Sequence, residues 1–201
     1  METTAAVGKS VIRKDAMDKA TGAAKFNSDV IIPGILHAKL VTSQYAHARI
    51  KSIDVSQAQN APGVKAVITG EYANGVLTGT FLEDRPIMAV GKVRYFGEPI
   101  AVVVATTEAE AMKAVKMVKV EYEPLPVVNS PGDALKPDAP LVHDDMEYYR
   151  FMKEVFPTPG TNIANHVKIR KGDMTKGWAE SEVIVEENFV LPQSDHAAME
   201  M

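Results

Sequence analysis

A histidine and two carboxylates near the C-terminal end have the clearest potential for chemistry. His196 and Glu200 stand four residues apart, and Asp195 precedes the histidine. On a helix this spacing places the side chains of His196 and Glu200 on one face, where they could bind one metal ion with Asp195 as a third ligand. The preceding Val190-Leu191-Pro192 favours an extended chain, in which a four-residue step separates the two groups too far. A hydrogen-bonding role near a domain interface is the favoured interpretation, and a His/carboxylate metalloprotein is an alternative.

Two other stretches combine charged, aromatic and turn-forming residues. They are Asp84-Arg85-Pro86 and Arg94-Tyr95-Phe96-Gly97-Glu98-Pro99. Such loops can be presented to a partner subunit or a cofactor. The favoured interpretation is structural: Gly97 permits a bulge, Pro99 begins the next strand, and Arg94 is paired at the surface. The remaining histidines have no cluster of ligands around them, and we expect surface or hydrogen-bonded roles for His37, His47, His143 and His166.

Motifs that would build a complete active site are missing from the sequence. The stretch Gly75-Val76-Leu77-Thr78-Gly79-Thr80 is rich in glycine, but no Gly-Lys-Ser/Thr follows, so we expect an ordinary loop there. Neither a Gly-x-Gly-x-x-Gly dinucleotide motif nor a Gly-x-Ser-x-Gly serine elbow occurs. With no cysteine, the chain cannot form a disulfide or hold a Cys-ligated iron–sulfur cluster. We predict no catalytic, cofactor-binding or metal-binding residue in these 201 residues.

The composition is that of a globular protein. Of the 201 residues, 46% are hydrophobic and 24% are charged, which is enough chain to bury one sizeable core or two small ones. The formal net charge is −4 and no run of basic residues occurs, so we expect no nucleic-acid partner. The longest apolar run, 100–105, is far below the ~20 residues that span a bilayer, and no secretory signal is visible at the N-terminus. These features predict a cytoplasmic protein with no membrane partner.

Apolar periodicity predicts strands in the first half of the chain. From Ile35 the residues alternate as a half-buried strand requires, with Leu36, Ala38 and Leu40 on one face and His37 and Lys39 on the other. A second strand is predicted over 46–55, with a bulge or bend where the apolar phase slips after Ile50. Ser56 is expected to cap a short helix over 57–59, and 64–69 is predicted to be a strand, followed by a loop over 70–79.

A strand–helix–strand unit is predicted from 98 to 123. The β-branched run 100–104 indicates a strand covered on both faces, at the centre of the core. Thr107 and Glu110 have the spacing of a capping box, and helical periodicity follows until 118. Strict alternation then predicts a strand that Pro124 ends. Such a unit places an amphipathic helix on one face of a sheet, so the fold class is α+β.

The last third of the chain changes character. The proline-rich stretch 129–161 is predicted to be a long connector over the surface. Beyond it we expect a strand over 166–170, a short helix after Asp173 around Trp178, and an alternating strand over 182–191.

Short phrases spread along nearly the whole chain, from about Gly8 to Met201, match one known family in order and spacing. They include Arg13-Lys14-Asp15-Ala16, Pro33-Gly34-Ile35-Leu36-His37-Ala38, Ala46-His47-Ala48-Arg49-Ile50, Pro62-Gly63-Val64-Lys65-Ala66-Val67, Arg94-Tyr95-Phe96-Gly97-Glu98-Pro99-Ile100-Ala101 and Val120-Glu121-Tyr122-Glu123-Pro124-Leu125-Pro126. The chain thereby resembles the α/β hammerhead region of the molybdenum-binding large subunit of the xanthine dehydrogenase and aldehyde oxidase family. The segment 146–161 matches no phrase of that family.

The resemblance implies an α/β hammerhead of mixed strands and two main helices, plus the start of a second domain. It divides the chain into an N-terminal arm (1–20), the hammerhead (21–128), a connector (129–161) and the start of the first molybdopterin-binding domain (162–201). The family's glycine-rich Gly-Gly-Phe-Gly loop and its catalytic glutamate are absent, so a structural fragment that is inactive alone is expected.

The family's reaction is hydroxylation of a purine, another N-heterocycle or an aldehyde with oxygen from water. The resemblance implies molybdopterin in the parent subunit, and iron–sulfur clusters and FAD in the parent complex. The expected partners are the remaining molybdopterin-binding domains and the iron–sulfur and FAD subunits or domains, and the fragment alone is expected to self-associate. A non-catalytic assembly or binding module is the competing class.

Overall fold

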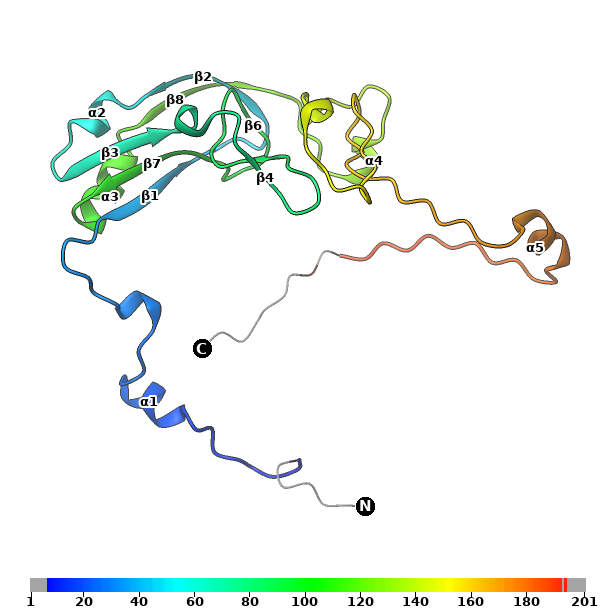
Figure 1. Cartoon of the computed structure of the whole chain (residues 1–201), viewed down its shortest axis with the longest axis horizontal. Coiled ribbons are helices and arrows are strands. Elements are labelled where there is room, and N and C mark those ends of the chain that lie inside the picture. Colours follow the sequence, from blue (N-terminus) through cyan, green and yellow to red (C-terminus); the bar gives the residue numbers. More distant parts are fainter. Residues whose placement is uncertain (1–6, 193, 195–201) are drawn as a thin grey trace. The chain divides into compact units, whose positions relative to one another are not determined.

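The computed structural model describes residues 7–192 and 194, and its chain divides into two units (Figure 1). One unit is the continuous stretch 34–172, and the other combines the segments 1–33 and 173–201. The larger unit contains β1 (His37–Thr42), β2 (Ala48–Asp54), α2 (Ser56–Gln59), β3 (Val64–Thr69), η2 (Gly70–Ala73), β4 (Leu77–Thr78), β5 (Arg85–Pro86), β6 (Lys92–Val93), β7 (Pro99–Ala105), α3 (Glu108–Val115), β8 (Lys119–Pro124), α4 (Pro131–Ala134) and η3 (Met146–Tyr148).

The first sheet has the order β1-β7-β3, and both of its strand pairs are antiparallel. The β-branched strand β7 is central, as the apolar run predicts. Its residues Val103 and Ala105 are fully buried. Val102 and Val104 point to the other face and are only half-buried. Within the unit 34–172, strand β7 is therefore covered on one face only. The prediction that it is covered on both faces is wrong.

Helix α3 covers one face of this sheet. Thr107 caps the helix, because its hydroxyl oxygen accepts a hydrogen bond from the Glu110 amide at 3.2 Å. The Glu110 carboxylate in turn accepts from the Thr106 and Thr107 hydroxyls at 2.6 and 2.8 Å. Ala111 and Ala114 are fully buried, which lets the helix approach the strands closely. The predicted helix and its capping signal are confirmed.

The second sheet has the order β6-β2-β8 and is also antiparallel. Strand β2 carries the predicted irregularity, since its register with β8 shifts between Ile50 and Ser52. The two strands that flank α3 thus lie in different sheets, β7 in the first and β8 in the second. Val120 of β8 packs against the buried residues of both hydrophobic clusters, and so it joins the two sheets into one core.

Further local expectations need correction. The stretch 70–79, expected to be a loop, contains η2 and the short strand β4. Ser56 does not cap α2 but is its first residue; the Ser56 amide donates to the Asp54 carboxylate at 2.9 Å. The phase of β1 is also reversed relative to the face we expected to be buried. Leu36 and Leu40 are 47% and 52% exposed, whereas Val41 is 7% exposed and faces the core.

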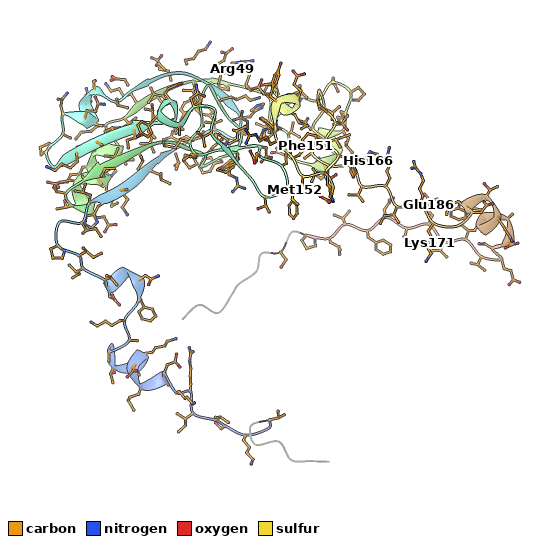
Figure 2. The ribbon with its side chains drawn as sticks, in the orientation of Figure 1. Arg49, Phe151, Met152, His166, Lys171 and Glu186 are labelled. Atoms are coloured by element: carbon orange, nitrogen blue, oxygen red, sulfur yellow. The ribbon has the colours of Figure 1, made fainter. Side chains whose placement is uncertain are left out.

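The stretch 129–161 is more than a surface connector. It belongs to the same unit as the sheets, and Met146, Tyr149 and Val155 are buried. Its backbone pairs with the loop after β4: Phe151 forms a bridge with Leu82, and the Met152 amide donates to the Phe81 carbonyl oxygen at 3.0 Å (Figure 2).

The other unit contains α1 (Ala16–Thr21), η1 (Asn27–Asp29) and α5 (Met174–Glu180). The predicted helix around Trp178 is confirmed, and the Asp173 carboxylate caps it by accepting from the Lys176 amide at 3.1 Å. The strands expected over 166–170 and 182–191 are not formed, and Phe189, Val190 and Leu191 are 85–94% exposed. Among the described residues, no helix is long and apolar enough to cross a membrane.

Candidate functional site

The register of the first sheet brings six aliphatic side chains into two rows on one face. Each residue lies directly opposite its partner in the neighbouring strand, and side chains alternate between the faces of a sheet. The rows are Ala38–Val104–Ala66 and Leu40–Val102–Ile68. We call these six residues the open face.

Both helices near this sheet pack on the opposite face. Ala58 of α2 and Ala114 of α3 belong to the buried cluster around Val41 and Val103. On the open face, Leu40 remains 52% exposed, and none of the six residues carries a charge. A contiguous apolar surface of this kind in a soluble protein is typical of an interface. The open face can bind another apolar surface; it offers no group for acid–base chemistry.

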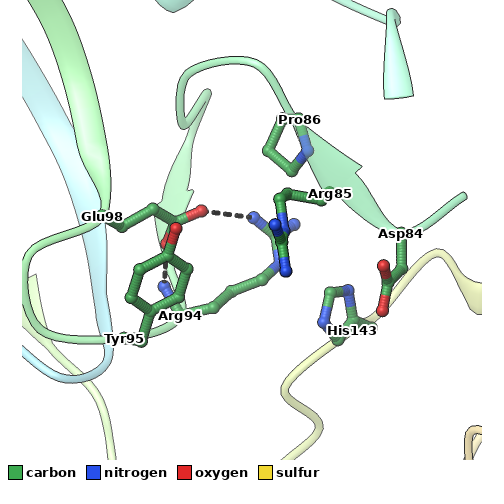
Figure 3. A pocket seen from close by; sticks show the side chains of 7 residues that line it. All are labelled: Asp84, Arg85, Pro86, Arg94, Tyr95, Glu98 and His143. Carbon is green, nitrogen blue, oxygen red and sulfur yellow. Dashed lines mark hydrogen bonds and ion pairs between the residues drawn. The ribbon is translucent and has the colours of Figure 1, made fainter. Parts of the chain in front are cut away.

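A second feature is a small cavity of about 190 Å³ beside the second sheet (Figure 3). We call it the Arg94 pocket. Its lining consists of Asp84, Arg85, Pro86, Arg94, Tyr95, Glu98 and His143. These residues come from both stretches that the sequence singled out and from the stretch 129–161. The sequence indicated the two stretches as separate features, and it gave no sign that they line one pocket together with His143.

Arg94 and Glu98 form the inner wall of the pocket. The Arg94 amide donates to Glu98 Oε2 at 2.5 Å, and the guanidinium Nη1 lies 3.9 Å from Glu98 Oε1. Burial raises the pKa of the Glu98 carboxyl, against the opposing effect of Arg94. The Arg94 side chain is 14% exposed, so the expectation of a surface ion pair is wrong. Gly97 has a φ of 86°, which allows the tight turn between Arg94 and β7.

His143 enters the pocket from the stretch 129–161. Its Nδ1 lies 2.9 Å from the Tyr149 hydroxyl, and the two rings meet edge to face at 5.6 Å. Burial, with a contribution from the Arg94 charge, lowers the pKa of His143. The neutral imidazole is therefore favoured, and the expectation of a hydrogen-bonded histidine is confirmed for this residue.

The other predicted site residues are dispersed. His47 is 5% exposed, and its Nδ1 lies 2.6 Å from the Pro126 carbonyl oxygen, as expected of a hydrogen-bonded histidine. His166 is exposed, and His37 is half-buried on β1. Asp195, His196 and Glu200 lie outside the described residues. Within the described residues, no group of three or more His, Cys, Asp or Glu side chains could hold a metal ion. That no catalytic, cofactor-binding or metal-binding residue occurs stays a prediction.

Comparison with known proteins connects this architecture to a family. Residues 21–126 match the aldehyde oxidase and xanthine dehydrogenase a/b hammerhead domain. The chain belongs to the xanthine dehydrogenase and aldehyde oxidase family. The small antiparallel sheets and few helices agree with a hammerhead domain, so the α+β class and the family expected from the sequence are confirmed.

Three relatives illustrate the similarity. A probable xanthine dehydrogenase subunit of Bacillus subtilis (strain 168) is 34% identical over 95% of this chain and 24% of its own length. The nicotinate dehydrogenase large molybdopterin subunit of Eubacterium barkeri is 30% identical over 96% of this chain and 42% of its own. The solved structure of a reconstituted CO dehydrogenase from Oligotropha carboxidovorans has a TM-score of 0.61, with 39% identity over 67% of this chain and 17% of its own.

The chain thus spans less than half the length of these relatives, all of which are named as dehydrogenases or parts of them. It corresponds to a part of a longer protein of this family. The open face belongs to the hammerhead that the family comparison covers, since all six residues lie within 21–126.

Proposed function

We propose that this chain is the hammerhead-bearing part of a molybdenum hydroxylase large subunit and that its own role is architectural. The parent reaction is hydroxylation of a purine, another N-heterocycle or an aldehyde with oxygen from water. The domain limits proposed are 1–20, 21–128, 129–161 and 162–201, with the last stretch contributing to the first molybdopterin-binding domain. The chain alone is inactive, and its parent is cytoplasmic.

The open face carries this proposal. A sheet in an α+β domain packs one face on the core. This sheet packs one face under α2 and α3, and its other face carries aliphatic rows in place of polar side chains. Covering Leu40 and its neighbours removes apolar area from water at about 25 cal/mol per Å². The remaining molybdopterin-binding domains of the same subunit are the proposed cover. Exposed Val183, Val185 and Phe189 are further apolar residues available to them.

The relatives and the family support the proposed cofactor arrangement. One relative is named a large molybdopterin subunit. We place molybdopterin in the parent subunit, bound by residues outside this chain, and iron–sulfur clusters and FAD in partner subunits or domains. The hammerhead would position the surrounding domains, because the protein's task around such a cofactor is binding and orientation.

A domain exchange tests the proposal. The corresponding region of the Bacillus subtilis relative is replaced with residues 21–172 of this chain, and the molybdopterin content and oxidoreductase activity of the purified hybrid are measured. The expected result is a hybrid that retains both. Leu40→Asp, which places a charge on the open face, should lower molybdopterin content at least tenfold.

Leu135→Asp is the matched control, since Leu135 is 65% exposed and lies outside both sheets. It should leave molybdopterin content unchanged. If Leu40→Asp left the molybdopterin content of the hybrid unchanged, the proposed role of the open face would be refuted. A non-catalytic module with no redox role would instead give a folded hybrid without activity.

A further inference from the structure

The Arg94 pocket holds more hydrogen-bond donors than the protein itself satisfies. A guanidinium carries five N–H donors. In the described chain, the Arg94 side chain donates to the Lys92 carbonyl oxygen at 3.2 Å and interacts with the Tyr149 side chain, whereas its Nε is buried without a partner. The nearest oxygen of Glu98 lies 3.9 Å from Nη1, which is too far for a hydrogen bond.

A second guanidinium enters the same pocket. Arg85 lines the cavity with Arg94, and Figure 3 shows both side chains directed into it. Asp84 also lines the pocket, but among the described residues neither Asp84 nor Arg85 forms an ion pair within 4.0 Å. Two cations in one small cavity repel each other, and Asp84 balances at most one of their two charges.

Glu98 is a poor substitute for a further anion. Glu98 is 3% exposed, and one of its oxygens is occupied by the Arg94 amide. Burial favours its neutral form. A free oxyanion in the pocket could approach the guanidinium groups of both Arg85 and Arg94, which favour carboxylate and phosphate as partners.

From this geometry we propose that the Arg94 pocket binds a small oxyanion between Arg85 and Arg94. The oxyanion is a carboxylate or phosphate group, supplied either by a free small molecule or by an acidic side chain of a covering domain. A cavity of about 190 Å³ accommodates such a group with a short stem. This site is distinct from the open face and does not depend on the proposed function.

Nuclear magnetic resonance of the ¹⁵N-labelled full chain tests the proposal through the guanidinium Nε–H resonances. Sodium phosphate and N-acetylglutamate amide are titrated separately at constant ionic strength, with sodium chloride as the reference. The expected result is a saturable shift of the Arg85 and Arg94 resonances with at least one probe. Saturation with phosphate indicates a free anion, whereas saturation with N-acetylglutamate amide alone indicates an acidic side chain.

Variants make the assignment specific. Arg85→Ala, at an exposed position, should weaken the affinity at least tenfold. Arg49→Ala is the matched control, because Arg49 is exposed on β2 and lies outside the pocket (Figure 2). Shifts that do not saturate, that sodium chloride reproduces, or that persist unchanged in Arg85→Ala would overturn the proposal.

Discussion

The ammonium group of Lys92 lies 2.5 Å from Asp144 Oδ2, joining β6 to a stretch 52 residues further along the chain. Lys92 is only 6% exposed, and its Nζ also donates to the Leu141 carbonyl oxygen at 3.1 Å. A buried ammonium needs such partners, because its charge is costly to remove from water. The pair therefore holds the stretch that delivers His143 to the Arg94 pocket.

Removing the carboxylate should loosen this attachment. We expect Asp144→Asn to lower the free energy of unfolding by about 1–2 kcal/mol, since Asp144 itself is 51% exposed and the pair is partly screened. Urea denaturation measures the change. Glu180→Gln removes an exposed ion pair with Lys176 and should cost less than about 0.5 kcal/mol. Equal effects of the two substitutions would contradict the structural role of Asp144.

Because the open face is apolar and exposed, we expect self-association and the free energy of unfolding to depend on different residues. Leu40→Asp should weaken self-association of the chain while lowering the free energy of unfolding by about 1 kcal/mol or less, because Leu40 is 52% exposed. Val103→Ala, on the covered face at 0% exposure, should cost about 2 kcal/mol and leave self-association unchanged. Sedimentation velocity and urea denaturation check the two effects; self-association insensitive to Leu40→Asp would argue against this interface.

Gly70 is predicted to be intolerant of a side chain. A Cβ at this position would lie 2.6 Å from the Ala89 carbonyl oxygen and 2.9 Å from that of Met88. Both are backbone atoms, so the loop must shift, and we expect Gly70→Ala to cost about 1–3 kcal/mol. Thermal unfolding measures the change. Gly132→Ala is the comparison, because Gly132 lies within α4 with its nearest atom at 3.9 Å, and it should be neutral or slightly stabilising.

Because of Glu98, we expect the stability of the folded chain to depend on pH. Burial raises the pKa of its carboxyl in the folded chain above that of an unfolded glutamate, at about 4.3. Between the two pKa values the folded chain binds more protons, so this residue's contribution to stability is complete at lower pH and is lost as the pH rises. We expect the stability of the wild type relative to Glu98→Gln to fall as the pH increases above about 4.3.

Glu108 provides a control of opposite sign. Lys39 lies 2.5 Å from its carboxylate and lowers the pKa of Glu108. Its contribution to stability is therefore present at higher pH and is lost as the pH falls. Urea denaturation at a series of pH values should show opposite slopes for Glu98→Gln and Glu108→Gln, each relative to the wild type. Parallel slopes would show that burial does not control Glu98.

The sequence by itself determined the main local elements between residues 37 and 124, whereas the strands expected over 166–170 and 182–191 are not formed. The β-branched run that became β7 favours an extended strand, and Thr107 with Glu110 defines the start of α3 through local hydrogen bonds. The bulge near Ile50 was visible as a slip in apolar phase. The short family motifs, found in the same order as in the family, also indicated the hammerhead. A set of motifs spread along the chain identifies a whole fold rather than one element.

Only the tertiary structure decided which face of each strand is covered. Leu40 and Val41 are both apolar, so alternation in β1 could not say which side α3 would cover. The Arg94 pocket likewise depends on Lys92 and Asp144, whose pairing across 52 residues leaves no periodic pattern in the sequence. The physical reason is that hydrogen bonds and side-chain alternation act over a few residues, whereas burial depends on which distant segments fold together.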